Sequence, residues 1–187
     1  TAGRGVVVAG NIGNAFSNVV AEVGPEDVVV LEVSSFQLDH VDTFRPRVSL
    51  LLNLTPDHLD RYGGSFEVYA ASKFRIFENQ MAGDTLIYNY DDEYVRDHVT
   101  QAARPEALSA VGFSLHHDVP DAGSFVREDA LVLRTDHTEE TIMHVKDLAP
   151  ALTGKHNIYN SLAAAMAARV MEVRSEVVRE SLTSFEG

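Results

Sequence analysis

The sequence has no cysteine among its 187 residues. It therefore cannot form a disulfide, a thiolate zinc site or a cysteine nucleophile. Long apolar runs are also missing: residues 48–52 have the length of a strand, far short of a membrane span. Residues 1–4 lack the apolar stretch of a signal peptide. These absences are compatible with a reducing compartment, and we expect a cytoplasmic protein that does not enter a membrane.

Positive charge is scarce as well. The chain has 15 Lys and Arg against 28 Asp and Glu, a formal net charge of -13, and lysine occurs only as Lys73, Lys146 and Lys155. Such a surface repels phosphate backbones and anionic lipid, so we expect no nucleic-acid or membrane partner. An anionic ligand would need a locally neutralised site, most simply with a metal cation.

What the chain does have is enough apolar material, 45% of its residues, for the core of one ordinary domain. Continuous apolar runs predict buried strands at residues 5–9, 27–31, 47–52 and 85–88. Unbroken strands of this kind alternating with helices predict an α/β fold with a mostly parallel sheet covered by helices. The helices are expected at residues 15–23, 36–41, 65–80, 93–103, 155–171 and 175–185.

The pattern changes after Pro105, where short segments of alternating polarity appear. They cover residues 108–113, 124–126, 130–134 and 140–145. Alternation is typical of strands with one solvent-exposed face, and it predicts a small antiparallel sheet.

Polar loops follow the first three predicted strands, at residues 10–13, 32–35 and 53–61. Ligands of parallel sheets sit outside the carboxyl ends of the strands. We therefore expect these three loops to converge on one edge of the sheet and to carry the chemistry.

Two residues in these loops suit a divalent-metal site. Glu32 follows four apolar residues, and it either caps the next helix, turns to solvent or binds a hard cation. His58 lies in a dense polar cluster with Asp57, Asp60 and Arg61, although a lone histidine is more often structural than a ligand. Together, Glu32 and His58 would make a credible metal site.

Lys73 falls on the apolar face of its predicted helix, together with Tyr69, Ile76 and Phe77. The ordinary interpretation is a buried stem whose ammonium reaches water. The alternative is a buried amine of lowered pKa that reacts with carbon dioxide, which gives a carbamate and hence an anionic oxygen ligand.

Two further segments offer amide side chains. His156 and Asn160, in the stretch Gly154–Asn160, lie one helical turn apart, and they indicate either helix capping or recognition of a purine. Asn11, in Gly10-Asn11-Ile12-Gly13, is either a turn residue or an amide for a nucleotide or sugar. The phosphate-binding pattern Gly-x-x-x-x-Gly-Lys-Ser/Thr and the Gly-x-Ser-x-Gly elbow of serine hydrolases occur nowhere.

In this order, the motifs resemble the Mur ligase family, and the resemblance spans nearly the whole chain. It rests on residues 10–13, 31–38, 52–62, 69–80 and 154–160. The stretch Ser34-Ser35-Phe36-Gln37-Leu38 favours the branch that adds D-glutamate over its sister ligases and over folylpolyglutamate synthases. Asp39 stands where that branch commonly has Glu, a conservative departure.

The resemblance implies a three-domain enzyme of which this chain is one part. Residues 1–182 resemble the central ATPase domain, which is P-loop NTPase-like, without its first strand and phosphate loop. Residues 183–187 resemble the start of the connection to the C-terminal domain. By this resemblance the chain is a fragment, inactive alone, of a protein that we expect to be a monomer.

The resemblance also implies site residues. Glu32 is similar to the ligand of the magnesium that bridges the ATP phosphates, His58 to a ligand of a second magnesium, and Lys73 to a carbamylated lysine that helps to hold this second ion. The adenine-binding region corresponds to Asn160, Asn157 and His156. Contacts to the UDP-muramoyl substrate correspond to Asn11, Ser34 and Asp57.

The implied reaction is ATP-dependent amide formation in peptidoglycan precursor synthesis. The carboxylate of UDP-N-acetylmuramoyl-L-alanine attacks the γ-phosphate of ATP, and the amine of D-glutamate then displaces phosphate from the acyl phosphate. Magnesium would offset the repulsion between the two anions. The alternatives are a metal-dependent phosphohydrolase built on Glu32, Asp57 and His58, a non-catalytic nucleotide-binding module, and another Mur-type or folylpolyglutamate-type ligase.

Overall fold

The computed structural model describes residues 5–102, 108–135 and 138–186. The chain divides into two compact units. The first unit comprises the residues up to Arg45 together with Pro56–Asn79, and the second comprises Pro46–Thr55 and the residues from Gln80 onward. The assignment of residues 1–182 to one truncated domain stays a prediction.

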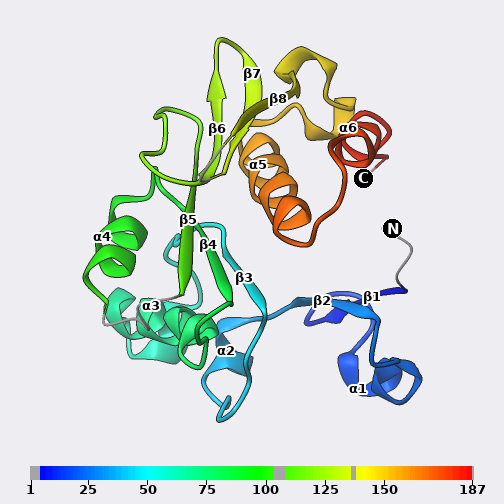
Figure 1. The fold of residues 1–187 in the computed structure, drawn as a ribbon. Coiled ribbons are helices and arrows are strands. Elements are labelled where there is room, and N and C mark those ends of the chain that lie inside the picture. The colour runs from blue at the N-terminus through cyan, green and yellow to red at the C-terminus, as the bar shows by residue number, and fades with distance from the viewer. Residues whose placement is uncertain (1–4, 103–107, 136–137, 187) are drawn as a thin grey trace. The chain divides into compact units, whose positions relative to one another are not determined.

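The first unit begins with two parallel strands, β1 (Val6–Gly10) and β2 (Val28–Glu32). Figure 1 shows the short helix α1 (Phe16–Val19) beside them. The predicted helix over residues 15–23 is divided into α1 and a 3-10 turn, η1 (Val20–Glu22). Ala15, at the N-cap, has no side chain that could satisfy the free backbone N–H groups, and β-branched valines follow, so both features disfavour a longer helix.

The rest of the first unit is helical. It contains α2 (Ser35–Leu38), η2 (Leu59–Tyr62), α3 (Phe66–Phe74) and η3 (Arg75–Phe77). Ser34 caps α2 and Ser65 caps α3, each by accepting a hydrogen bond from a backbone N–H in the first turn of its helix. The predicted helix over residues 65–80 is thus confirmed as α3 with a tighter last turn.

A polar contact joins α2 to α3. The Ser72 hydroxyl lies 2.5 Å from Asp39 Oδ1 and 2.8 Å from the carbonyl oxygen of Ser35. The Tyr62 hydroxyl donates to Asp39 Oδ2 at 3.2 Å, and the Arg75 guanidinium donates to the Asp39 carbonyl at 2.7 Å. Because Ser72 is buried and Asp39 is partly buried, this network fixes α3, and with it Lys73, against α2.

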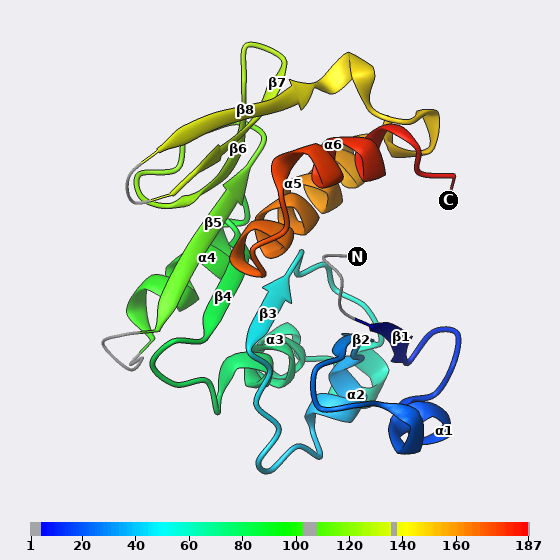
Figure 2. The same cartoon turned by 45° about the vertical axis from the view of Figure 1, so that its right-hand side comes forward.

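The second unit is built on a six-stranded sheet in the order β3-β4-β5-β6-β7-β8. Figure 2 labels all of these strands. The strands are β3 (Val48–Leu51), β4 (Thr85–Asn89), β5 (Ser109–Ser114), β6 (Gly123–Arg127), β7 (Ala130–Arg134) and β8 (Glu139–His144). The pairs from β3 to β6 are parallel, and the pairs β6–β7 and β7–β8 are antiparallel. The mostly parallel α/β fold is confirmed.

The predicted small antiparallel sheet is corrected in one respect. The segment at residues 108–113 forms β5, which pairs parallel with β4, and β6 pairs parallel with β5. Only β6, β7 and β8 are antiparallel, and they extend the same sheet. The alternation of polarity did not reflect one solvent-exposed face, since β5, β6 and β7 are mostly buried and only β8 is mostly exposed or partly exposed.

The prediction that the first three strands share one sheet is wrong. In the described part of the chain β1 pairs with β2, whereas β3 pairs with β4. Val48 and Leu50 of β3 pack against the core of the second unit. Burial of these side chains therefore assigns β3 to the second unit.

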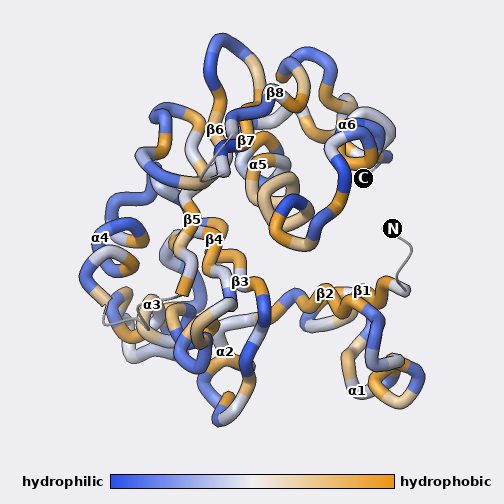
Figure 3. Tube along the Cα trace, viewed as in Figure 1, coloured by the Kyte–Doolittle hydropathy of each residue, from blue (hydrophilic) through white to orange (hydrophobic). Residues whose placement is uncertain are grey.

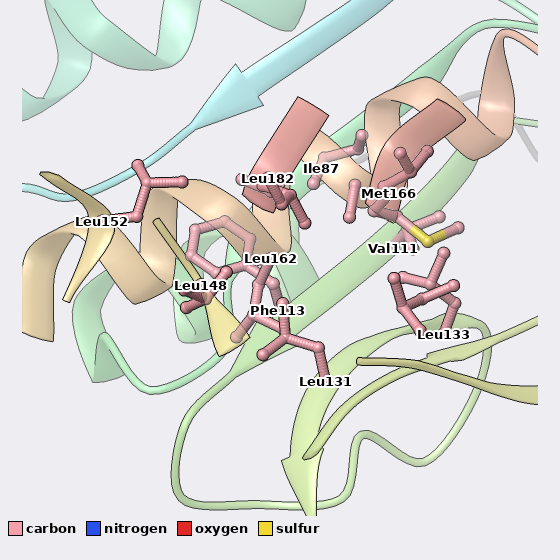
Figure 4. Packing of buried hydrophobic residues seen from close by; sticks show 14 of the residues in the cluster. Ile87, Val111, Phe113, Leu131, Leu133, Leu148, Leu152, Leu162, Met166 and Leu182 are labelled. Carbon is pink, nitrogen blue, oxygen red and sulfur yellow. The ribbon is translucent and has the colours of Figure 1, made fainter. Parts of the chain in front are cut away.

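The core of the second unit lies between the sheet and two helices, α5 (Lys155–Val170) and α6 (Ser175–Thr183). The tube in Figure 3 is largely apolar along β3, β4 and β5. Figure 4 shows Phe113 and Leu131 of the sheet near Leu162 of α5. All three of these side chains are fully buried. Burial of a side chain of this size contributes roughly 1.5–3 kcal/mol to folding.

The remaining elements are α4 (Glu93–Gln101) and two 3-10 turns, η4 (Val145–Asp147) and η5 (Pro150–Leu152). Asp92 caps α4 by accepting from the backbone N–H of Val95. None of the helices in the described residues has both the length and the apolar character that a membrane crossing requires.

Candidate functional site

The loop at residues 10–13 is attached to the end of β2. Gly10 stands opposite Glu32 in the strand register, and the backbone N–H of Asn11 donates to the Glu32 carbonyl at 2.8 Å. Gly10 has a φ of +140°, and a Cβ at this position would lie 2.1 Å from the Glu32 carbonyl oxygen. Only glycine permits this close approach, which brings two of the predicted site residues, Asn11 and Glu32, together.

The carboxylate of Glu32 is exposed and has no hydrogen-bond or ion-pair partner in the part of the chain that the structure describes. It does not cap the next helix, because that role belongs to Ser34. The Ser34 hydroxyl accepts from the backbone N–H of Gln37, whose side chain in turn accepts from the Ser34 N–H at 2.9 Å. Of the alternatives for Glu32, helix capping is therefore wrong, and the substrate contact predicted for Ser34 stays a prediction.

His58 is held in an uncommon conformation at the start of η2. Its φ is +50°, in the left-handed region, and its backbone N–H donates to Asp57 Oδ1 at 2.8 Å. The imidazole Nε2 lies 3.6 Å from Asp57 Oδ2, and the ring centroid lies 5.3 Å from that of Phe36. The Arg61 guanidinium also covers the Phe36 ring, at 4.2 Å. Contacts with Asp57 and Phe36 thus orient an imidazole that remains 61% exposed.

Lys73 lies where the helical pattern predicts, on the face of α3 that carries the buried residue Tyr69. It is half-buried, and its ammonium lies 5.3 Å from the centroid of the Tyr69 ring. No carboxylate pairs with it among the residues described. A stem packed along an apolar face with an unpaired amine at its end suits both interpretations of this lysine.

These side chains do not form a ready metal cage. Among the described residues, no three His, Asp or Glu side chains are close enough together to hold a metal ion. The structure does bring Asn11 to Glu32 and Asp57 to His58. Any metal here would therefore need oxygen atoms from a bound ligand or from a modified side chain.

The second set of predicted residues lies in the second unit, at the start of α5. The N-cap, Gly154, has no side chain that could cap the helix, and the Asn157 amide donates instead to the Ala151 carbonyl at 2.8 Å. His156 and Asn160 are exposed, and their side chains have no partner within the described ranges. Asn157 therefore has a structural contact, whereas His156 and Asn160 are available to a ligand.

The surface of the second unit has two hollows, and none of the predicted site residues lines either of them. One, of about 680 Å³, runs along α4 between Asp92 and Gln101. The other, of about 510 Å³, lies on the β6–β8 strands beside Arg127 and Glu139. In each unit, the candidate groups are thus mostly exposed side chains at strand ends and helix ends.

Sequence reasoning missed Asp91, which follows β4. Its carboxylate accepts hydrogen bonds from the Ser114 hydroxyl at 2.6 Å, the Leu115 N–H at 2.7 Å and the Tyr159 hydroxyl at 2.8 Å. Burial acts to raise the pKa of Asp91, but these hydrogen bonds outweigh burial and hold the pKa below its usual range. The only local signal was the pair of acidic residues, Asp91-Asp92, shortly after a buried strand.

Comparison with known proteins decides the family. The family model described as Mur ligase middle domain matches residues 14–168. The chain belongs to the Mur ligase family. The matched region includes Glu32, His58, Lys73 and the start of α5, and Asn11 lies just before it. The resemblance inferred from the motifs is confirmed.

The two curated relatives described next carry the same name. The chain is 55% identical over its whole length to UDP-N-acetylmuramoylalanine–D-glutamate ligase of Salinibacter ruber, covering 40% of that protein. It is 41% identical over 95% of its length to the ligase of the same name from Chlorobium limicola, covering 39% of that protein. The chain thus spans about two fifths of the length of these relatives.

Solved structures show the same fold at low sequence identity. The MurF ligase from Thermotoga maritima in complex with ADP matches 99% of this chain with a TM-score of 0.66 and 16% identity, over 43% of its own length. A UDP-N-acetylmuramate:L-alanyl-gamma-D-glutamyl-meso-diaminopimelate ligase from Neisseria meningitides matches 98% of the chain with a TM-score of 0.62 and 17% identity, over 67% of its length.

The contact between Gly10 and Glu32 gives a stability prediction. In the full-length protein, Gly10→Ala should lower the free energy of unfolding by roughly 2–4 kcal/mol, because the new Cβ would overlap the Glu32 carbonyl. The control is Gly13→Ala, where φ is +79° but no atom lies within 4 Å, so a loss of only about 1 kcal/mol is expected. Denaturant unfolding measures both variants, and equal losses would contradict the close approach.

Proposed function

We propose that the full-length protein is an ATP-dependent ligase that adds D-glutamate to UDP-N-acetylmuramoyl-L-alanine in peptidoglycan precursor synthesis. The observation that carries the proposal is 55% identity, over all 187 residues, to a ligase with this name. The stretch Ser34–Leu38, which favours the D-glutamate-adding branch, caps and forms α2 at the end of β2. The proposal therefore agrees with both the sequence motif and its place in the fold.

ATP is the proposed energy source. The MurF ligase of similar fold was solved with ADP. In this chain, the exposed amide of Asn160 can accept from the amino group of adenine and donate to N7, and His156 lies one turn before it. Asn157 supports this segment by its hydrogen bond to Ala151. We assign adenine recognition to His156 and Asn160, with Asn157 holding the start of α5.

Two magnesium ions complete the proposal, and the donor chemistry fits them. Glu32 offers an unpaired, exposed carboxylate, the kind of hard oxygen ligand that Mg²⁺ prefers. His58 offers an oriented, exposed imidazole, and Lys73 offers an unpaired amine that could carry a carbamate. Glu32 would hold one ion, and His58 with carbamylated Lys73 the other. When bound, the ions offset the repulsion between an attacking carboxylate and a phosphate.

The remaining substrate contacts are proposed for the first unit. Asn11 is exposed and fixed beside Glu32, Ser34 caps α2, and Asp57 orients His58. We propose that these three groups face the UDP-muramoyl substrate. The phosphate-binding pattern does not occur in these 187 residues, so we expect them to be inactive on their own. A monomeric state and a cytoplasmic location stay predictions.

The comparisons do not favour the metal-dependent phosphohydrolase. The curated relatives are named as ligases, and the Asp57 carboxylate is engaged with the backbone and ring of His58. The two functions differ in what they require, since a phosphohydrolase needs only a phosphoester and water.

The substrate requirement tests the proposed function. The full-length protein should release phosphate from ATP only when both UDP-N-acetylmuramoyl-L-alanine and D-glutamate are present, because the second substrate displaces the phosphate. A coupled phosphate assay with each substrate omitted in turn measures this requirement. L-Glutamate serves as the matched control, for which no release is expected. Phosphate release when one of the two substrates is omitted would favour the phosphohydrolase. Hydrolysis of simple phosphoesters would do the same.

The role of Lys73 gives a second prediction. Lys73→Ala should lower turnover by roughly 100-fold or more, because it removes the amine that would carry an anionic ligand. A small carboxylate such as formate should restore part of the activity by taking the place of the carbamate. Lys146→Ala, at an exposed lysine outside the proposed site, serves as the control and should keep full activity. Full activity of Lys73→Ala would exclude the carbamate role.

A further inference from the structure

We propose that Tyr159 is a positioning residue for nucleotide binding: its hydroxyl, held by the buried carboxylate of Asp91, fixes the start of α5 and thereby His156 and Asn160. The inference rests on the adenine contacts proposed above. In this inference Tyr159 does not contact the nucleotide. It determines the positions of His156 and Asn160, which do.

Asp91 is built into the second unit as a fixed anchor. Its side chain is only 7% exposed, although it is a carboxylate. Its three hydrogen-bond donors come from different places: Ser114 at the end of β5, Leu115 directly after β5, and Tyr159 on α5. Hydrogen bonds to an ionised acceptor are shorter and stronger than those between neutral groups. The position of Asp91 is therefore determined by the sheet, and Tyr159 is attached to that position.

Tyr159 packs toward the sheet, whereas the side chains of the proposed ligand-binding residues are exposed. Tyr159 is half-buried, with its ring centroid 6.1 Å from that of Phe113 in β5, whereas His156 and Asn160 are exposed. Tyr159 directly precedes Asn160, so successive side chains point about 100° apart around the helix axis. The hydrogen bond to Asp91 consequently fixes the rotation of the helix, and this rotation sets the direction of Asn160.

Little else holds this part of the helix by polar contacts. Gly154 offers no side-chain cap, and the Asn157 amide reaches only the neighbouring turn, at Ala151. For residues 155–160, Tyr159 to Asp91 is the only side-chain hydrogen bond to the sheet or its loops within the described parts of the chain. Loss of the Tyr159 hydroxyl should therefore loosen the first turns of α5 more than the rest of it.

The protonation states keep this contact in place. Burial, together with the hydrogen bond to Asp91, raises the pKa of the Tyr159 hydroxyl well above its usual value. The pKa of Asp91 stays below its usual range, as described above. Both shifts favour a protonated Tyr159 as donor and an ionised Asp91 as acceptor.

Tyr159→Phe in the full-length protein tests the inference, because it removes one oxygen and keeps the ring against Phe113. We expect the Kd and KM for Mg-ATP to rise roughly 3- to 10-fold, which corresponds to part of one hydrogen bond to a charged group. The kcat at saturating ATP and the KM values for the other two substrates should not change. Amide hydrogen exchange should become faster at the start of α5.

Tyr90→Phe is the matched control. It deletes the same atom one residue away from Asp91, and the Tyr90 hydroxyl has no hydrogen-bond partner among the described residues. This variant should bind Mg-ATP as the unchanged protein does. An equal weakening of ATP binding in both variants would contradict the specific role of Tyr159.

The outcomes separate this inference from the proposed function. If the unchanged protein carries out the ligation but Tyr159→Phe binds Mg-ATP equally well, or loses only melting temperature, the positioning role is wrong and the ligase function stands. If the unchanged protein binds Mg-ATP but does not ligate, the ligase function is wrong, and the Kd of Tyr159→Phe still decides the positioning role. If the unchanged protein binds no Mg-ATP, both are wrong.

Discussion

The packing of α5 against the mostly parallel sheet is the interaction on which the second unit depends. Leu162, Ala163 and Ala165 of this helix are buried against the sheet, and the small alanines allow the helix to approach closely. Burial of one side of α5 leaves its other side, with His156 and Asn160, for a ligand. In the first unit, a hydrogen bond between the Ser72 hydroxyl and the Asp39 carboxylate holds α3 against α2. This contact determines the position of Lys73 on α3.

Much of this could be predicted from the sequence where the signal is local. The continuous apolar runs correctly indicated the positions of β1, β2, β3 and β4. The predicted burial holds for β4, which is buried throughout, but is wrong for β1 and β2, where Val8 and Val30 are exposed. The long alanine-rich pattern predicted α5 to within one residue. The ordered motifs identified the family, and the helical period placed Lys73 on the buried face of α3.

What failed was non-local. The parallel pairing of β5 with β4 and β6 depends on which strands lie side by side. The sequence of a short alternating segment does not indicate which strand it pairs with. The assignment of β3 to a different unit from β2 likewise depends on packing against α5. Asp91 and Tyr159 are 68 residues apart, so no local pattern could join them. The sequence likewise does not show that the Asn157 amide reaches Ala151, and the role of Asn157 in adenine binding stays a prediction.

The central claim is that a carboxylate of the substrate is activated as an acyl phosphate. The most direct test is to supply the full-length protein with UDP-N-acetylmuramoyl-L-alanine labelled with ¹⁸O in its carboxylate, together with ATP and D-glutamate. When the amine displaces phosphate from the acyl phosphate, one carboxylate oxygen leaves with it, so the account predicts one ¹⁸O atom in the released phosphate. Phosphate that carries no label, with its new oxygen drawn from water, would contradict the account.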